Sequence, residues 1–184
     1  MPPAPPLTIL VMGAGSLGSV TGGFMANAGH GVHLVGRNPH MEAIAQNGLR
    51  ITGIWGDHQA TDLHTYTSVA DVPEIEFDLV ILAVKSYDTD AALIGLKPYV
   101  SGETLICSYQ NGLGNIERIA EHYGWDRSVE CRVIYGARLN EPGVVEVTVM
   151  AHKTALGTYR DTPHLAKIKR IADAMHASGV PTEY

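Results

Sequence analysis

The stretch Leu7-Thr-Ile-Leu-Val-Met-Gly-Ala-Gly-Ser-Leu-Gly18 decides the fold of this chain. Its first half is an apolar, β-branched run typical of a buried strand, and its second half carries the pattern G-x-G-x-x-G before a helical pattern. In a dinucleotide-binding turn, the first glycine permits the tight turn, the second lets backbone N–H groups approach a pyrophosphate, and the third lets the helix pack on the strand. An ordinary strand-to-helix turn is the alternative. We predict that a pyrophosphate is bound by Gly13, Ala14, Gly15, Ser16, Leu17 and Gly18.

Length and charge restrict the class of protein. The 184 residues suffice for one well-buried domain, which we place at 7–184 after a flexible lead-in over 1–6. The 13 Lys and Arg residues are outnumbered by 19 Asp and Glu residues and form no basic run, which argues against a nucleic-acid surface. No apolar stretch reaches the length of a membrane span, and the lead-in lacks the pattern of a secretory signal. We expect a cytoplasmic protein whose partner is a small molecule.

Cysteine and histidine residues indicate neither a metal site nor a disulfide framework. The two cysteines, Cys107 and Cys131, both lie in apolar runs that predict buried strands. The nine histidines show no metal-ligand spacing, so we assign them neither a metal nor a catalytic role.

Alternating strands and helices predict an α/β fold with a doubly wound, mainly parallel sheet of the Rossmann type. The predicted strands cover 7–12, 31–35, 78–84 and 104–108, and the predicted helices cover 16–28, 39–47, 87–96 and 113–123.

The remaining segments are predicted to add to this sheet. A hairpin insertion is expected from strands over 49–54 and 60–67. Strand-like runs over 129–139 and 144–149, with a further one over 154–158, should extend the sheet with antiparallel edges. A last helix is expected to begin at Thr162-Pro163 and to end near Ser178-Gly179.

Arg37 follows the second predicted strand, where an NAD-type fold places an acidic residue for the ribose 2′-hydroxyl. A guanidinium there offers charge-assisted hydrogen bonds to a 2′-phosphate. NADP(H) is therefore the expected cofactor, with a solvated arginine at a strand end as the alternative.

Two further blocks follow central strands, at the sheet edge that lines the ligand crevice of open α/β folds. Lys85 follows the 78–84 strand and is interpreted either as a cation beside cofactor or substrate, or as a surface lysine. Asp88 and Asp90 are explained as favourable charges in a first helical turn. Asn111 follows the 104–108 strand, and its amide suits nicotinamide, ribose or substrate oxygens, although a plain Asn-Gly turn explains it as well.

Taken together, Gly13 to Gly18, Gly36-Arg37-Asn38, Ala83 to Thr89 and Gln110 to Asn115 resemble the ketopantoate reductase (2-dehydropantoate 2-reductase) family. The resemblance covers Leu7 to about Val180 and corresponds to that family's N-terminal cofactor domain. It implies reduction of a 2-keto acid by NADPH, on the route to pantothenate in the best-known case. The roles it implies are the pyrophosphate at Gly13 to Gly18, the 2′-phosphate at Arg37, the nicotinamide end at Lys85 and Asn111, substrate also at Asn111, and a further cofactor contact at Ala137.

By the same resemblance, the proton-donating lysine belongs to a helical domain that would start beyond Tyr184. We therefore expect these residues alone to bind NADP(H) without turnover, and we identify no general acid among them. We also expect copies of the domain to associate, for example as a homodimer, through the exposed face that would meet the helical domain. Two alternatives stay open: a non-catalytic NADPH-binding or sensing module, and the cofactor domain of another hydroxyacid or opine-type dehydrogenase.

Overall fold

The computed structural model describes residues 5–184. Their main sheet has eight strands, and all neighbouring pairs are parallel except β11 with β8. This confirms the predicted α/β class with a mainly parallel sheet and an antiparallel pairing near one edge. In spatial order the strands are β12 (Thr182–Glu183), β11 (Thr154–Gly157), β8 (Ser128–Arg132), β7 (Leu105–Ser108), β6 (Leu79–Leu82), β1 (Thr8–Met12), β2 (Gly31–Val35) and β5 (His64–Tyr66).

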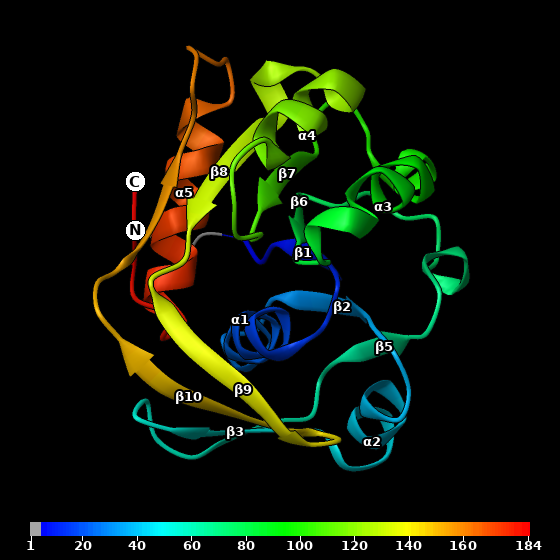
Figure 1. Ribbon diagram of the computed structural model, residues 1–184, viewed down its shortest axis with the longest axis vertical. Helices are drawn as coiled ribbons and strands as arrows, with labels where there is room; N and C mark the ends of the chain where they lie inside the picture. The colour runs from blue at the N-terminus through cyan, green and yellow to red at the C-terminus, as the bar shows by residue number, and fades with distance from the viewer. Residues whose placement is uncertain (1–4) are drawn as a thin grey trace.

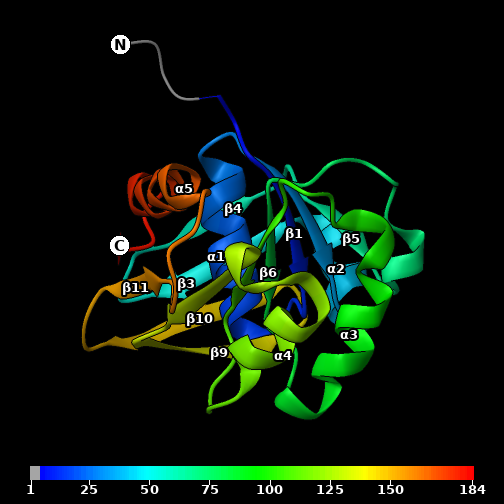
Figure 2. The ribbon, with the colours of Figure 1, turned by 90° about the horizontal axis from the view of Figure 1, so that it is seen from above.

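Helices cover both faces of this sheet (Figure 1). One face carries α1 (Ser16–Asn27) and α5 (Leu165–Ala177), and the other carries α3 (Thr89–Gly95) and α4 (Asn115–Tyr123). From above, β1 and β6 stand between α5 and α3 (Figure 2). The short α2 (His40–Asn47) packs beside β5.

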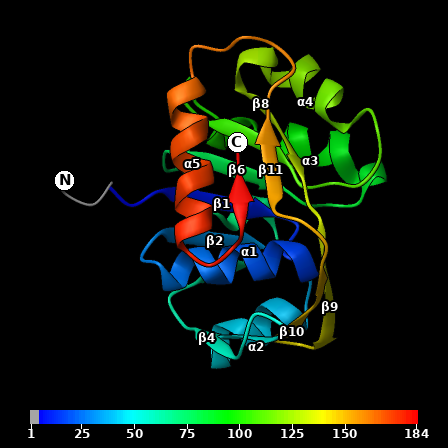
Figure 3. The same ribbon diagram turned by 90° about the vertical axis from the view of Figure 1, so that its left-hand side faces the viewer.

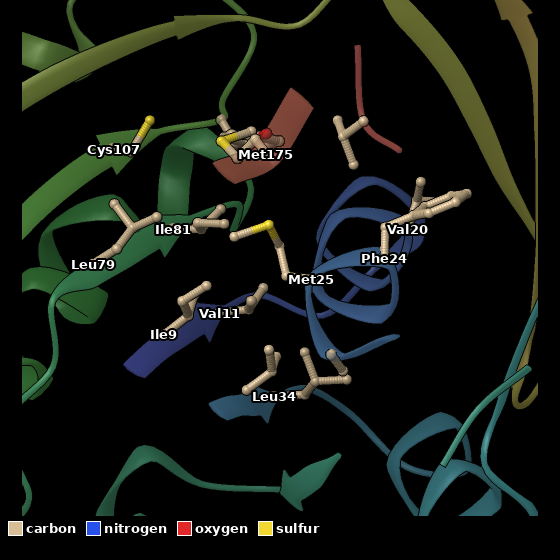
Figure 4. Packing of buried hydrophobic residues seen from close by; sticks show 14 of the residues in the cluster. Ile9, Val11, Val20, Phe24, Met25, Leu34, Leu79, Ile81, Cys107 and Met175 are labelled. Carbon is tan, nitrogen blue, oxygen red and sulfur yellow. The ribbon is translucent and has the colours of Figure 1, made fainter. Parts of the chain in front are cut away.

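Successive side chains of the central strands point to opposite faces of the sheet and so contribute to two separate hydrophobic cores. Ile9 and Val11 of β1 face α1, whereas Leu10 between them joins the cluster under α3 and α4. On the α1 side, Met25 packs among the side chains of β1 and β6 (Figure 4). The central strands β1, β6 and β7 are therefore buried on both faces, as parallel strands usually are.

A second sheet was not expected. It contains, in spatial order, β4 (His58–Ala60), β3 (Leu49–Gly53), β10 (Val144–Met150) and β9 (Tyr135–Glu141). The prediction that the 129–139 and 144–149 runs both extend the main sheet is wrong, because β9 and β10 pair with each other and β10 pairs in parallel with β3. Figures 1 and 3 show α1 enclosed between the two sheets.

Small residues on α1 explain this arrangement. A Cβ on Gly22 would lie 2.8 Å from Leu34 in the main sheet, and one on Gly23 would lie 2.7 Å from Ile51 in the second sheet. Glycines at both places allow close approach of a sheet on each side. Ser19 and Thr21 are also fully buried, so α1 presents no solvated face over its middle turns.

Several predicted boundaries need correction. The 129–139 run divides into β8 and β9, because β8 stays in the main sheet while β9 crosses to the second one. The 60–67 run likewise divides, with β4 in the hairpin and β5 beside β2. The last helix begins at Leu165, since Thr162 instead accepts a hydrogen bond from the backbone N–H of His164 at 3.1 Å and donates one to Asp126.

The segment between β7 and α4 also differs from the prediction. Gly112 and Gly114 have φ values of +96° and +87°, which keeps the loop out of the helix, so that α4 begins at Asn115.

Of the predicted lead-in, residues 1–4 lie outside the described part of the chain, and the Pro5 carbonyl accepts a hydrogen bond from Arg170. Within residues 5–184, no helix combines the length and apolar character needed to cross a membrane.

Candidate functional site

The loops that follow β1, β2 and β6 meet in a crevice at the carboxyl edge of the main sheet, with a volume of about 360 Å³. A second hollow of about 280 Å³ adjoins it and shares Gly13, Gly36, Arg37, Val84 and Asp88. The crevice brings together Gly13, Ala14, Gly15, Arg37 and Lys85, which come from three separate motifs of the sequence.

The glycine turn has two residues whose lack of a side chain is required by the fold. Gly13 has a φ of +106°, and a Cβ there would lie 2.6 Å from backbone atoms of Ala83 and Val84. A Cβ on Gly18 would lie 2.7 Å from the carbonyl oxygen of Gly13. The first glycine thus permits the turn and the third permits close packing of helix on strand, as the pattern predicts.

Gly15 differs from both. Its φ is −86°, it is exposed, and a Cβ built on it would meet nothing within 4 Å. The fold of residues 5–184 therefore gives no reason for a glycine at this position. Gly15 is the N-cap of α1, whose first turn holds no acidic residue and no side-chain cap, so the N–H groups of the first helical turn have no acceptor within the helix. Gly15 itself lines the crevice, so this helix end begins beside it. This environment favours an anion close to the backbone.

Arg37 lies at the crevice mouth with 87% of its side chain exposed, and its Nη2 atom is 3.5 Å from Oδ2 of Asp88. The explanation of Asp88 and Asp90 as charges in a first helical turn agrees with the structure. Asp88 lies in the single 3₁₀ turn Ser86–Asp88 and is the N-cap residue of α3, although its side chain makes no capping hydrogen bond, and Asp90 lies in the first turn of α3. Asp88 is a residue of the site that sequence reasoning missed.

The Lys85 and Asn111 segments lie side by side but face different hollows. The Ser86 hydroxyl donates a hydrogen bond to the Asn111 carbonyl at 3.2 Å. The Gln110 amide nitrogen donates to the Val84 carbonyl at 3.0 Å, which ties the same two segments together. Lys85 lines the main crevice, whereas Asn111 lines a neighbouring hollow of about 350 Å³ beside β8 and β11.

The other predicted cofactor residues do not line the main crevice in residues 5–184. Ser16 begins α1, Leu17 packs against the core, and Gly18 is buried against β1. Ala137, in β9, is half-buried and packs on the same core. Contacts of these four residues with a cofactor stay predictions.

The wall of the crevice opposite Lys85 comes from the second sheet. Leu139 and Pro142, near the β9–β10 turn, line it, although no sequence motif singled them out. His40 holds this turn in place: its Nδ1 accepts a hydrogen bond from the Gly143 N–H at 2.9 Å, and its Nε2 lies 3.0 Å from the Ser19 hydroxyl. Nδ1 is therefore unprotonated and Nε2 donates to Ser19. Burial lowers the pKa of His40, in keeping with a neutral, structural histidine.

The fold and this crevice define a Rossmann-type α/β domain, with its ligand crevice outside the carboxyl ends of the strands. Residues 9–161 match the model of the family described as Ketopantoate reductase PanE/ApbA. This match covers more than half of the sequence, and the chain belongs to the ketopantoate reductase family.

Individual relatives agree with this assignment. The chain is 36% identical to the 2-dehydropantoate 2-reductase of Aquifex aeolicus over 179 residues, which are 97% of this chain and 55% of that protein. It is 36% identical to the enzyme of the same name from Pyrococcus abyssi, over 96% of this chain and 55% of that protein. The chain thus spans about half the length of these curated relatives.

Solved structures resemble this fold closely. The crystal structure of 2-dehydropantoate 2-reductase from Geobacter metallireducens matches with a TM-score of 0.84 at 30% identity, over 95% of this chain and 56% of that one. D-mandelate dehydrogenase, solved with NADH and anilino(oxo)acetate, matches with a TM-score of 0.83 at 23% identity, over 96% of this chain and 56% of that one. At that identity the likeness concerns the fold alone.

Proposed function

We propose that residues 7–184 form the NADP(H)-binding domain of a 2-dehydropantoate 2-reductase-like oxidoreductase. The whole enzyme would transfer a hydride from NADPH to a 2-keto acid such as ketopantoate. The observation that carries this proposal is Gly15, a glycine that the fold itself does not need, at an uncapped helix N-terminus beside the exposed guanidinium of Arg37.

The residues of the crevice fit a dinucleotide in a defined order. The N–H groups of the first turn of α1, which follows Gly15, would hold the pyrophosphate, and Arg37 at the mouth would hold a 2′-phosphate. Lys85 and Asn111 would serve the nicotinamide end and Asn111 also the substrate, as the family resemblance implies. The bound cofactor would supply the hydride. The residues of this chain would anchor its phosphates and orient its reactive end.

Arg37 is also expected to determine the preference of this domain for NADPH over NADH. Charge-assisted hydrogen bonds to a 2′-phosphate contribute about 1.5–3 kcal/mol, so NADPH should bind roughly ten- to a hundredfold more tightly than NADH. Calorimetric titration with both cofactors measures this ratio, and Arg37→Ala should remove most of it. Arg138, which pairs with Glu146 in the second sheet, is a matched control whose alanine variant should keep the ratio. Equal affinities of the unsubstituted chain for the two cofactors would refute the NADP(H) assignment.

Self-association and location are further parts of the proposal. Tyr87 and Leu113, from the loops that carry Lys85 and Asn111, are 80% and 99% exposed. These side chains support association of copies through this edge of the domain, a surface that a helical domain would cover in longer relatives. Cys107 and Cys131 are buried free thiols, which supports a reducing, cytoplasmic location.

A second candidate is a non-catalytic NADPH-binding or sensing module, and a third is the cofactor domain of another hydroxyacid or opine-type dehydrogenase. The open crevice of this domain supports binding in all three cases. Turnover of a 2-keto acid when the chain is tested alone and with an added helical domain separates the first candidate from the second, and comparison of candidate keto acids under the same conditions separates it from the third.

A further inference from the structure

The crevice that holds Arg37 also holds a carboxylate to which the family resemblance assigns no role. Oδ2 of Asp88 is 3.5 Å from Nη2 of Arg37, across 51 residues of sequence. Asp88 lines both the main crevice and the adjoining hollow, as Arg37 does. An NAD-type fold uses an acidic side chain to bind the ribose 2′-hydroxyl, and an NADP-type fold uses an arginine to bind the 2′-phosphate. This crevice holds one side chain of each kind.

The two side chains differ in how firmly they are held. Asp88 closes a short 3₁₀ turn in which its backbone N–H donates to the Lys85 carbonyl at 2.8 Å. The next residue, Thr89, is fully buried and donates to the Ser86 carbonyl at 2.8 Å. Gln110 donates to the Thr89 hydroxyl at 2.7 Å. Arg37 by contrast projects from a strand end, and its side chain is 87% exposed. The guanidinium can move away from this pair more readily than the carboxylate can.

We propose that Asp88 is a specificity-determining residue for the cofactor and that its carboxylate lowers the preference for NADPH over NADH. Two effects act in the same direction. Asp88 competes with an incoming 2′-phosphate for the guanidinium of Arg37. It also repels that phosphate, since an anion hydrogen-bonded at about 2.9 Å to the same Nη2 atom lies within roughly 6 Å of the carboxylate oxygen that is 3.5 Å from that atom. This separation is below the Debye length at physiological salt.

The magnitude follows from charge and distance. A phosphate that carries nearly two negative charges, about 6 Å from a carboxylate in a water-like medium, loses roughly tenfold in affinity before screening by salt. We therefore expect Asp88→Asn to tighten NADPH binding about three- to tenfold. NADH has no 2′-phosphate, and its affinity should change by less than about twofold.

This inference rests on the proposed function, and the test separates the two. NADPH and NADH are titrated by calorimetry into the unsubstituted chain, Asp88→Asn and the control Asp90→Asn. Asp90 is two residues away and pairs with Arg118, so its substitution removes the same charge outside the crevice. Adenosine 2′,5′-bisphosphate and AMP serve as shorter probes of the same difference.

The expected result is a rise of about three- to tenfold in the ratio of NADPH to NADH affinity for Asp88→Asn alone, which shrinks in 0.5 M salt, roughly as screening requires. An unchanged ratio in a chain that binds NADPH would overturn the inference and leave the proposed function intact. A lower ratio would also overturn it, by showing that Asp88 positions Arg37 for the phosphate. If the unsubstituted chain binds neither cofactor, the proposed function itself fails.

Discussion

Replacement of Gly15 by valine separates the requirements of the fold from those of the ligand. Its φ of −86° and ψ of −155° are extended backbone that valine adopts readily, and a Cβ would have nothing within 4 Å. Loss of a tolerable N-cap residue costs up to about 1 kcal/mol, and the reduced freedom of the unfolded chain offsets about half of that. The free energy of unfolding should therefore change by less than about 1 kcal/mol.

The binding of NADPH should respond very differently. A valine side chain at the crevice floor would keep a pyrophosphate away from the backbone N–H groups and remove one or two charge-assisted hydrogen bonds. At about 1.5–3 kcal/mol each, this is a loss in affinity of at least roughly tenfold for one bond and roughly a hundredfold or more for two. Urea denaturation measures the first quantity and calorimetric titration the second.

Gly13→Ala is the matched comparison, because Gly13 lies in the same loop but the fold itself requires a glycine there. Its φ of +106° and the 2.6 Å approach to the backbone of Ala83 and Val84 predict a cost of about 3 kcal/mol or more. The reasoning is refuted if Gly15→Val folds normally and binds NADPH with unchanged affinity, or if it unfolds as readily as Gly13→Ala.

Two further predictions concern acid stability and turnover. Burial, and secondarily the charge of His64, lowers the pKa of His33 to about 4. A histidine with a depressed folded pKa destabilises the fold as pH falls below its unfolded value, so the free energy of unfolding should drop by about 2 kcal/mol between pH 6.5 and pH 4. His33→Asn should reduce this dependence of the free energy of unfolding on pH. The reduction should be partial, because burial also lowers the pKa of His30 and His40. An unchanged pH dependence in urea denaturation would contradict the role given to His33. Residues 1–184 alone, mixed with NADPH and ketopantoate, should show no substrate-dependent NADPH oxidation by absorbance. Oxidation that depends on ketopantoate and is lost in Lys85→Ala would make Lys85 the general acid instead.

The spacing of apolar residues and glycines predicted those parts of the fold that depend on residues close together in the sequence. The strand, glycine turn and helix over 7–28 are specified by spacing and by what each glycine must avoid, and the structure confirms the positions of Gly13 and Gly18. The carboxyl-edge rule predicts that Arg37 and Lys85 share one crevice, because parallel strands end at the same edge, and both residues line it.

Partners distant in sequence could not be predicted in this way. Alternation shows that β9 and β10 are strands, but it does not show which edge they join. The buried small residues of α1, Gly22 and Gly23, are a signal that could have indicated a second sheet, since a helix with a solvated face has no need of them. The Asp88–Arg37 pair depends on how two loops distant in sequence approach each other, which the spacing of apolar residues along the chain does not indicate.

The pairing of β10 with β3 also has a consequence for how the chain reaches this structure. The hydroxyl of Thr52 donates to the Val145 carbonyl across 93 residues, and the Arg50 N–H donates to the Gly143 carbonyl in the same pairing. Contacts so distant in sequence require closure of a long loop before they contribute any stability, and they slow folding. During synthesis the glycine loop and β2 leave the ribosome long before β10 does. The wall formed by Leu139 and Pro142 is thus completed late, and a nascent chain would have its phosphate-binding turn before it has a closed crevice around it.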